Sequence, residues 1–223
     1  MNAGPAVYLL SIPGKLAPTS VEAARLIHND TAGAPASVAA ARSLGDLSHM
    51  VYVSANGGGP GDFLILDLWN NLDGLNQFFA NHQVQEQAGL IFSQRDPRVW
   101  EPAEGFAGYH FPVPYGKNDR FVGFVHGSVR SRAEAQAIHN SLVEAAINQS
   151  RLHGSVSHEA YFLLTPPGVP ESLEFCAVDV WMDAAGMAGL YQDPEFLRGA
   201  QAMFAGAPSM SAWTHPAGSW VEW

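Results

Sequence analysis

The sequence predicts an α+β fold in which one structural unit occurs twice in tandem. The stretch 42–52 returns at 151–161 with its Arg, Gly, Ser, His and Tyr at matching places and without a gap. An Asp-x-Trp sequence then follows at 67–69 and again at 179–181. The apolar runs and turn residues around the two copies also occur in the same order, and such self-similarity indicates a repeat architecture.

Length and charge limit the class of protein. A chain of 223 residues suits one large domain or two small ones, and an apolar content of 47% is enough to bury a sizeable core. The formal net charge is −10, with only 11 Lys plus Arg. This balance argues against nucleic acid and against an anionic membrane surface as partners, because both attract clustered basic residues.

Cysteine and hydropathy point to a cytoplasmic protein. Cys176 is the only cysteine, which excludes an internal disulfide and a multi-cysteine metal site. It lies in an apolar run, as expected of a buried thiol. The N-terminal apolar run is short for a signal peptide, and no run of about 18 apolar residues predicts a membrane span. We therefore expect a soluble, cytoplasmic chain.

The first copy is expected to start with a strand and a broken helix. An apolar strand runs from Val7 to Ile12, and Pro13-Gly14 is expected to end it. Ser20 can cap the helix that follows. Thr31 to Pro35 should break this helix, because proline cannot donate to the helical ladder, and a second helical piece should reach about Leu44.

The second copy differs in this helix and in its hairpin loop. Residues 131–152 contain no glycine or proline and should form one unbroken helix. In the first copy, strands 47–54 and 62–69 flank the glycine-rich loop 56–61. This loop lacks the lysine of a phosphate-binding loop and precedes a strand, so it indicates a hairpin turn. Residues 165–170 take its place in the second copy.

Each copy continues with helical segments and a last strand, at 98–101 and at 211–214. The order strand–helix–strand–strand–helix–strand predicts a ferredoxin-like antiparallel sheet with helices on one face. Because the strands are apolar on both faces, we expect the two sheets to pack on each other. The predicted boundaries are 1–102 for the first repeat, 103–119 for an aromatic and proline-rich connector, and 120–223 for the second repeat.

This arrangement resembles the dimeric α+β barrel superfamily, which includes antibiotic-biosynthesis-monooxygenase-like and EthD-like proteins. The resemblance rests on element order and repetition, and it implies tandem repeats that form an intramolecular dimeric α+β barrel. It also implies a ligand pocket between the sheet and the helices of each repeat. Members include cofactor-free oxygenases, isomerases and cyclases, haem enzymes and proteins without known activity. A monomeric pseudo-dimer is permitted, and further homodimerisation stays open.

Two repeated histidine–aspartate pairs are the candidate catalytic residues. Antiparallel pairing around the hairpin can place His49 opposite Asp67, and the same register places His158 opposite Asp179. A carboxylate orients an imidazole and raises its pKa, which makes the histidine a candidate general base. A satisfied core pair that stabilises the fold is the structural alternative, because duplication preserves both kinds of contact.

A second repeated pair lies on the first helix of each copy, as His28-Asn29 and His139-Asn140. We expect these residues either to face the pocket or to cap the edge of the helix, and we treat them as candidate ligand-binding residues. Either histidine would be the axial ligand if haem bound, as the resemblance allows, although arginines for the haem propionates are scarce. No spacing demands a metal site, so none is predicted.

Four aromatic residues complete the candidate ligand-binding set, either as core or as the wall of an aromatic pocket: Tyr52, Tyr161, Trp69 and Trp181. Together these features favour an enzyme without a bound cofactor, which acts on a small apolar or aromatic molecule. Proton abstraction by histidine would lead to oxygenation, isomerisation or cyclisation. The alternatives are a ligand-binding protein without catalysis and a haem-binding member of the same superfamily.

Overall fold

The computed structural model describes residues 6–55, 61–112 and 120–223. The chain divides into two compact units, Met1–Glu101 with His215–Trp223, and Pro102–Thr214. This division differs from the predicted boundaries at both connections. Residues 215–223 belong to the first unit, and the first part of the predicted connector belongs to the second. Residues 113–119 of the connector lie outside the described residues.

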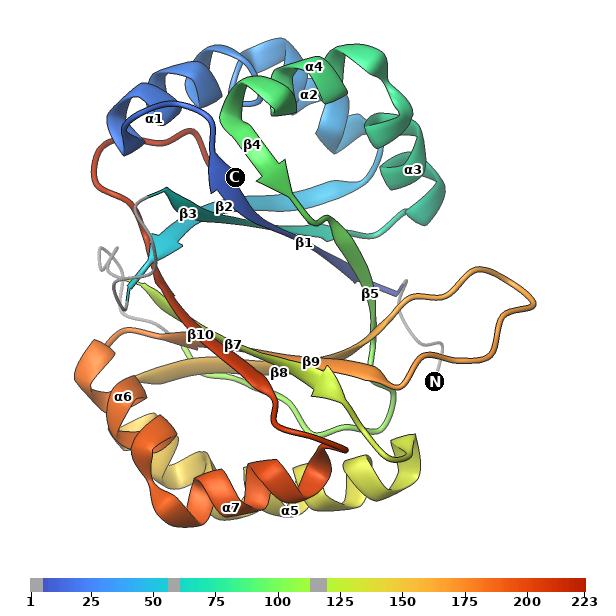
Figure 1. Cartoon of the computed structure of the whole chain (residues 1–223), viewed down its shortest axis with the longest axis vertical. Coiled ribbons are helices and arrows are strands. Elements are labelled where there is room, and N and C mark those ends of the chain that lie inside the picture. The colour runs from blue at the N-terminus through green and yellow to red at the C-terminus, as the bar shows by residue number, and fades with distance from the viewer. Residues whose placement is uncertain (1–5, 56–60, 113–119) are drawn as a thin grey trace. The chain divides into compact units, whose positions relative to one another are not determined.

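The first unit contains an antiparallel sheet with strand order β2-β3-β1-β4, in which β5 also pairs with β1. Its helices lie together on one side of the sheet (Figure 1). The strands are β1 (Tyr8–Leu16), β2 (Asp46–Ser54), β3 (Asp62–Trp69), β4 (Phe92–Arg95) and β5 (Arg98–Pro102). The helices are α1 (Val21–Asp30), α2 (Pro35–Ser43), α3 (Leu72–Ala80) and α4 (His82–Ile91).

The expected end of the first strand at Pro13-Gly14 is wrong, because β1 continues to Leu16. Gly14 permits this continuation by letting β4 approach closely. A Cβ atom at Gly14 would lie 2.3 Å from the carbonyl oxygen of Gln94 and 2.6 Å from the ring of Phe92. The glycine therefore acts here as a contact residue within the sheet, and not as a turn.

The second unit repeats this plan, with strand order β10-β7-β9-β8-β6 and helices on one face of the sheet (Figure 1). Its strands are β6 (Tyr109–His110), β7 (Phe121–Ser128), β8 (Ser155–Leu163), β9 (Glu174–Trp181) and β10 (Ser209–Thr214). Its helices are α5 (Arg132–Leu152), α6 (Ala184–Gln192) and α7 (Pro194–Met203).

The predicted helix break is confirmed. The Ser20 hydroxyl caps α1, which ends at Asp30, and Pro35 begins α2. The corresponding α5 runs without interruption for 21 residues. The predicted hairpin is confirmed by the antiparallel pairing of β2 and β3, although residues 56–60 of its loop lie outside the described residues.

The fold class is α+β with tandem ferredoxin-like repeats, as predicted. In the first unit, buried side chains from the sheet and the helices form one core that includes Val51, Phe63, Trp69 and Leu75. Among the described residues, no helix has the length and apolar character needed to cross a membrane.

Candidate functional site

Each unit buries a histidine–aspartate pair on neighbouring strands. His49 on β2 lies opposite Asp67 on β3, and His158 on β8 lies opposite Asp179 on β9. The Nδ1 atom of His49 is 2.7 Å from Oδ1 of Asp67, and the same atoms of His158 and Asp179 are 2.6 Å apart. The predicted hydrogen bond is therefore present in both copies.

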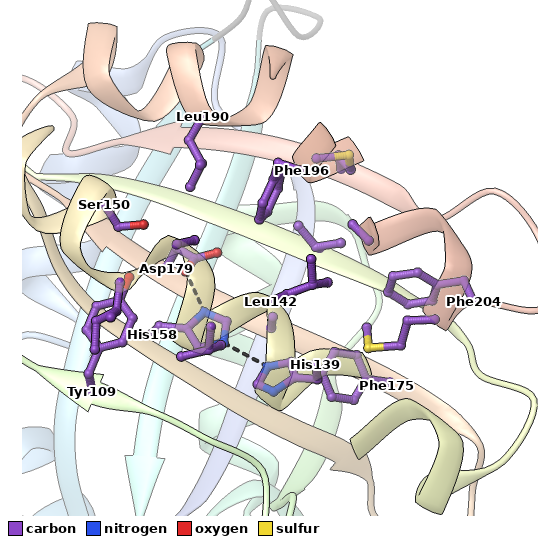
Figure 2. Close-up of a pocket in the computed structure, with 18 residues that line it drawn as sticks. Tyr109, His139, Leu142, Ser150, His158, Phe175, Asp179, Leu190, Phe196 and Phe204 are labelled. Atoms are coloured by element: carbon purple, nitrogen blue, oxygen red, sulfur yellow. Dashed lines mark hydrogen bonds and ion pairs between the residues drawn. The ribbon is translucent and has the colours of Figure 1, made fainter. Parts of the chain in front are cut away.

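A helix histidine extends each pair into a chain of three side chains. His28 on α1 places its Nε2 atom 2.9 Å from Nε2 of His49. In the second unit, Nε2 of His139 on α5 is 2.8 Å from Nε2 of His158. Figure 2 shows this second chain, in which His158 lies between Asp179 and His139. The two histidines of each unit also stack with nearly parallel rings.

The asparagine after each helix histidine determines which nitrogen of that histidine carries a proton. Asn29 Oδ1 accepts from the backbone N–H of Val221 at 2.9 Å, and its Nδ2 donates to the carbonyl of Ser219 at 2.9 Å. These two backbone contacts orient the amide. Its oxygen then lies 3.2 Å from Nδ1 of His28, so Nδ1 must be the donor.

It follows that the strand histidine carries two protons. With its proton on Nδ1, a neutral His28 can only accept at Nε2, so the N–H between the rings belongs to His49. The other nitrogen of His49 faces Asp67, and because an ionised carboxylate can only accept, that nitrogen also carries a proton and the pair is an imidazolium with a carboxylate. Asn140 imposes the same pattern on His139 through the N–H of Ala107 and the carbonyl of Gly105.

The electrostatic environment agrees with this proton arrangement. Burial, and then the positive charge of His49, lower the pKa of His28 to about 4. Burial and His158 likewise lower the pKa of His139 to about 4. Burial also opposes the charge on His49 and His158, but the paired carboxylates outweigh it and raise the pKa of both.

Both strand pairs border a cavity between the sheet and the helices. The cavity of the second unit comprises about 680 Å³ of space between side chains, its open mouth included. Its wall is mainly apolar and includes Leu142, Leu190, Phe196 and Phe204 (Figure 2). The cavity of the first unit comprises about 650 Å³ of space on the same measure, and its wall includes Asp46 and Arg95 besides the histidine–aspartate pair.

The other predicted ligand-binding residues divide into two groups. His139 lines the cavity of its unit, whereas His28 is fully buried and is not part of the cavity wall. Asn29 and Asn140 bind backbone instead, as described above. The four aromatic residues are buried in the core and are not among the described residues that line either cavity, namely Tyr52, Tyr161, Trp69 and Trp181.

Asp46 is the acidic residue that the sequence analysis missed. It begins β2, lines the first cavity and is only 5% exposed. Its Oδ1 atom has no hydrogen-bond partner among the described residues. Burial, and then the charge of Asp67, raise the pKa of Asp46 to about 8, while His49 acts in the opposite direction. The gapless repeat places Ser155 at this position in the second copy. The sequence signal for Asp46 was therefore an acidic residue that the first copy has and the second lacks.

Tyr191 is the second missed residue. Its hydroxyl donates to Oδ2 of Asp179 at 2.6 Å, so both oxygens of this carboxylate are bound. Gly123, which pairs with Asp179, leaves the necessary room, because a Cβ atom there would lie 1.9 Å from the Tyr191 hydroxyl.

Each chain of three side chains is covered by a short segment with two aromatic residues. Trp220 packs on His28 and Trp223 stacks on His49, with ring centroids 5.1 and 4.6 Å apart. In the second unit, Phe106 packs on His139 and Tyr109 on His158, at 5.1 and 5.7 Å. The sequence signal is weak: a Pro-Ala pair at 102–103 and again at 216–217.

The residues present do not fit haem or a metal ion. Both ring nitrogens of His28 and of His139 already contact neighbouring side chains. The first cavity has Arg95 as its basic residue, and no Lys or Arg is among the described residues that line the second. Within the described ranges, no group of three or more His, Cys, Asp or Glu residues is arranged to hold a metal ion.

Comparisons with known proteins identify the fold. No family model and no curated protein matches this sequence. An anthrone oxidase-like protein of known structure is similar at 14% identity and a TM-score of 0.64, over 96% of this chain and 92% of its own. A monooxygenase-like protein from Listeria innocua matches at 10% identity and a TM-score of 0.55, over 96% of both chains.

A mutant chlorite dismutase from Candidatus Nitrospira defluvii is also similar, at 10% identity and a TM-score of 0.54, over 97% of this chain and 93% of its own. These similarities extend over both units. The chain thus shares its fold with these proteins.

Proposed function

We propose that this chain is an enzyme of the oxygenase type, which acts without a bound cofactor on a small apolar or aromatic molecule. The observation that carries the proposal is a buried imidazolium–carboxylate pair at the wall of an otherwise apolar cavity. An apolar wall accepts an aromatic ring, and a buried positive charge stabilises an anion formed beside it. The similarity to anthrone oxidase-like and monooxygenase-like proteins supports this chemistry.

The proposed reaction begins with the transfer of a proton from the substrate to a water molecule. A methylene group between two aromatic rings becomes a carbanion that is delocalised into a ring carbonyl. Dioxygen then oxidises this carbon: the methylene becomes a carbonyl, and the second oxygen atom leaves as water. Atoms and electrons balance without a further reductant.

The proton arrangement narrows the role that we propose for the strand histidines. A His49 or His158 that already carries two protons cannot accept another. In this form the histidine mediates proton abstraction by stabilising the anion, with Asp67 or Asp179 as the residue that orients it. It becomes a general base only after the proton between the two Nε2 atoms has moved to the helix histidine, His28 or His139.

Anthrone is a suitable probe of this proposal. The purified protein should consume oxygen with anthrone and form anthraquinone faster than buffer alone, and His49→Gln should reduce the rate. The visible spectrum of the same sample should lack a cofactor band. Binding of anthrone without oxygen uptake would indicate a carrier, and a haem spectrum would refute cofactor independence.

A further inference from the structure

The first cavity contains a buried acceptor without a partner. Oδ1 of Asp46 is shielded from solvent and has no hydrogen-bond partner among the described residues, although Asp46 is part of the cavity wall. An acceptor left in this way is costly unless a ligand or a water molecule completes it.

A buried donor without a partner lies on the same wall. Trp223 lines the first cavity and stacks on His49, and its indole N–H is shielded and unpartnered among the described residues. This N–H is near enough to Asp46 to lower the pKa of that carboxyl, but it does not reach hydrogen-bond geometry with it. The carboxyl oxygen and the indole N–H are therefore neighbouring and complementary, and neither makes a hydrogen bond of normal geometry with the described residues.

We infer that the first cavity binds the hydroxyl group of a phenol or enol between Asp46 and Trp223, and that Asp46 is the catalytic residue that accepts the hydroxyl proton. A hydroxyl oxygen accepts from the Trp223 N–H while its hydrogen points to Oδ1 of Asp46. Phe78, Phe79 and Ile91 provide apolar wall for the aromatic ring. The inference deepens the proposed function and rests on it for the substrate class.

The proton transfer is balanced within the site. The O–H bond of the ligand breaks, the proton goes to the Asp46 carboxylate, and the electron pair stays on the ligand oxygen. The Trp223 N–H and the charge of His49 then stabilise the resulting anion. The step needs no oxidant and precedes any reaction with oxygen.

The charged groups around Asp46 are compatible with this role. The charges of His49 on β2 and Asp67 on β3 act on it, Arg95 on β4 lines the same cavity, and Glu222 acts on His49 from the segment 215–223. The pKa of Asp46, about 8, suits a base that works near neutral pH.

The second cavity lacks this arrangement. Ser155 replaces Asp46, and Tyr109 takes the place of Trp223. The two hydroxyls lie 2.9 Å apart and bind each other. We therefore assign the hydroxyl-binding site to the first unit.

Binding of 2-naphthol to the whole chain tests the inference without oxygen chemistry. Its affinity is measured by fluorescence, and ionisation by the red-shifted absorption of the naphtholate. The wild-type protein should bind 2-naphthol with a naphtholate band and should bind naphthalene at least about tenfold more weakly, because naphthalene leaves Asp46 unpartnered. Asp46→Asn, which keeps the side-chain shape, should lose the band and about tenfold in affinity.

Two further variants control for folding and position. Trp223→Phe keeps the ring stacking and should weaken 2-naphthol binding several-fold, whereas Ser155→Ala in the second unit should leave the naphtholate band unchanged. A band that persists in Asp46→Asn, or equal affinity for naphthalene and 2-naphthol, overturns the inference. If 2-naphthol ionises at Asp46 but anthrone is not oxidised, the proposed function fails and the hydroxyl site stands.

Discussion

The two units contain the same chain of three side chains but differ at its acidic end. In the second unit, Tyr191 and His158 bind both oxygens of Asp179. The first unit has Phe79 at the position of Tyr191, and it brings a second carboxyl, Asp46, beside Asp67. The chain of three side chains is common to both units, so Asp46, which has no acidic counterpart in the second unit, is what distinguishes the first.

Single positions on neighbouring elements account for the difference. Gly123 pairs with Asp179 and makes room for the Tyr191 hydroxyl, whereas Leu10 pairs with Asp67 in the first unit. A leucine side chain fills that space, and the phenyl ring of Phe79 has no hydroxyl to place there. In the first unit, Asp67 therefore has no tyrosine hydroxyl as a donor among the described residues.

Removal of the central histidine should give the largest effect, and it should be unequal. His49→Gln should lower oxygen uptake with anthrone about 100- to 1,000-fold by removing the anion-stabilising charge. It should also lower the free energy of unfolding by about 3–5 kcal/mol, because breaking a buried pair leaves Asp67 uncompensated. His158→Gln should cost less stability, since Asp179 keeps Tyr191. Equal losses in urea unfolding would contradict the comparison.

Asp46→Ser should change the pH dependence of stability. The folded state raises the pKa of Asp46 from 3.8 to about 8, so it holds this proton more tightly than the unfolded chain does. The contribution to stability is complete below about pH 4 and is lost as the pH rises toward 8. Between pH 4 and pH 8, the free energy of unfolding of Asp46→Ser should therefore rise by about 2–4 kcal/mol relative to that of the wild-type protein.

Urea unfolding across this range measures the Asp46 effect, with Ser155→Ala as the matched control in the second unit. The control should keep the pH slope of the wild-type protein. Parallel curves for Asp46→Ser and the wild type would show that Asp46 titrates normally.

Gly123→Ala should test why the tyrosine is confined to the second unit. The added methyl group would lie 1.9 Å from the Tyr191 hydroxyl, so overpacking should cost about 1–3 kcal/mol in thermal unfolding. Adding Tyr191→Phe should recover part of that loss, because the hydroxyl is then absent. A double variant whose loss equals the sum of the single losses would show that the two positions are independent.

Asn29→Ala and Asn140→Ala should have the smallest effects and should be similar. Each asparagine joins a helix histidine to the backbone of the covering segment through two hydrogen bonds, so each loss should be about 1–2 kcal/mol. Nitrogen NMR of the histidines should also show that His28 or His139 no longer keeps its proton on Nδ1. An unchanged tautomer would refute the role of the asparagine.

The sequence by itself determined the features that depend on local pattern or on neighbouring strands. The repeat was visible as identities, and Pro35 broke the first helix because proline cannot donate within a helix. The His49–Asp67 and His158–Asp179 bonds followed from the register of two hairpins, since adjacent antiparallel strands face each other in a regular order. The end of the first strand was misjudged, because Gly14 serves a contact with β4.

Tertiary structure alone decided how the sites are completed. Contact between the two histidines of each unit depends on how a helix packs on its sheet. The periodicity of apolar residues identifies the helix but does not specify this packing. Trp223 and Tyr109 are distant in sequence from the histidines on which they stack, so only tertiary packing places them there. Asp46 looked like a polar residue at a strand end, and its raised pKa arose only when packing removed water and brought Asp67 near.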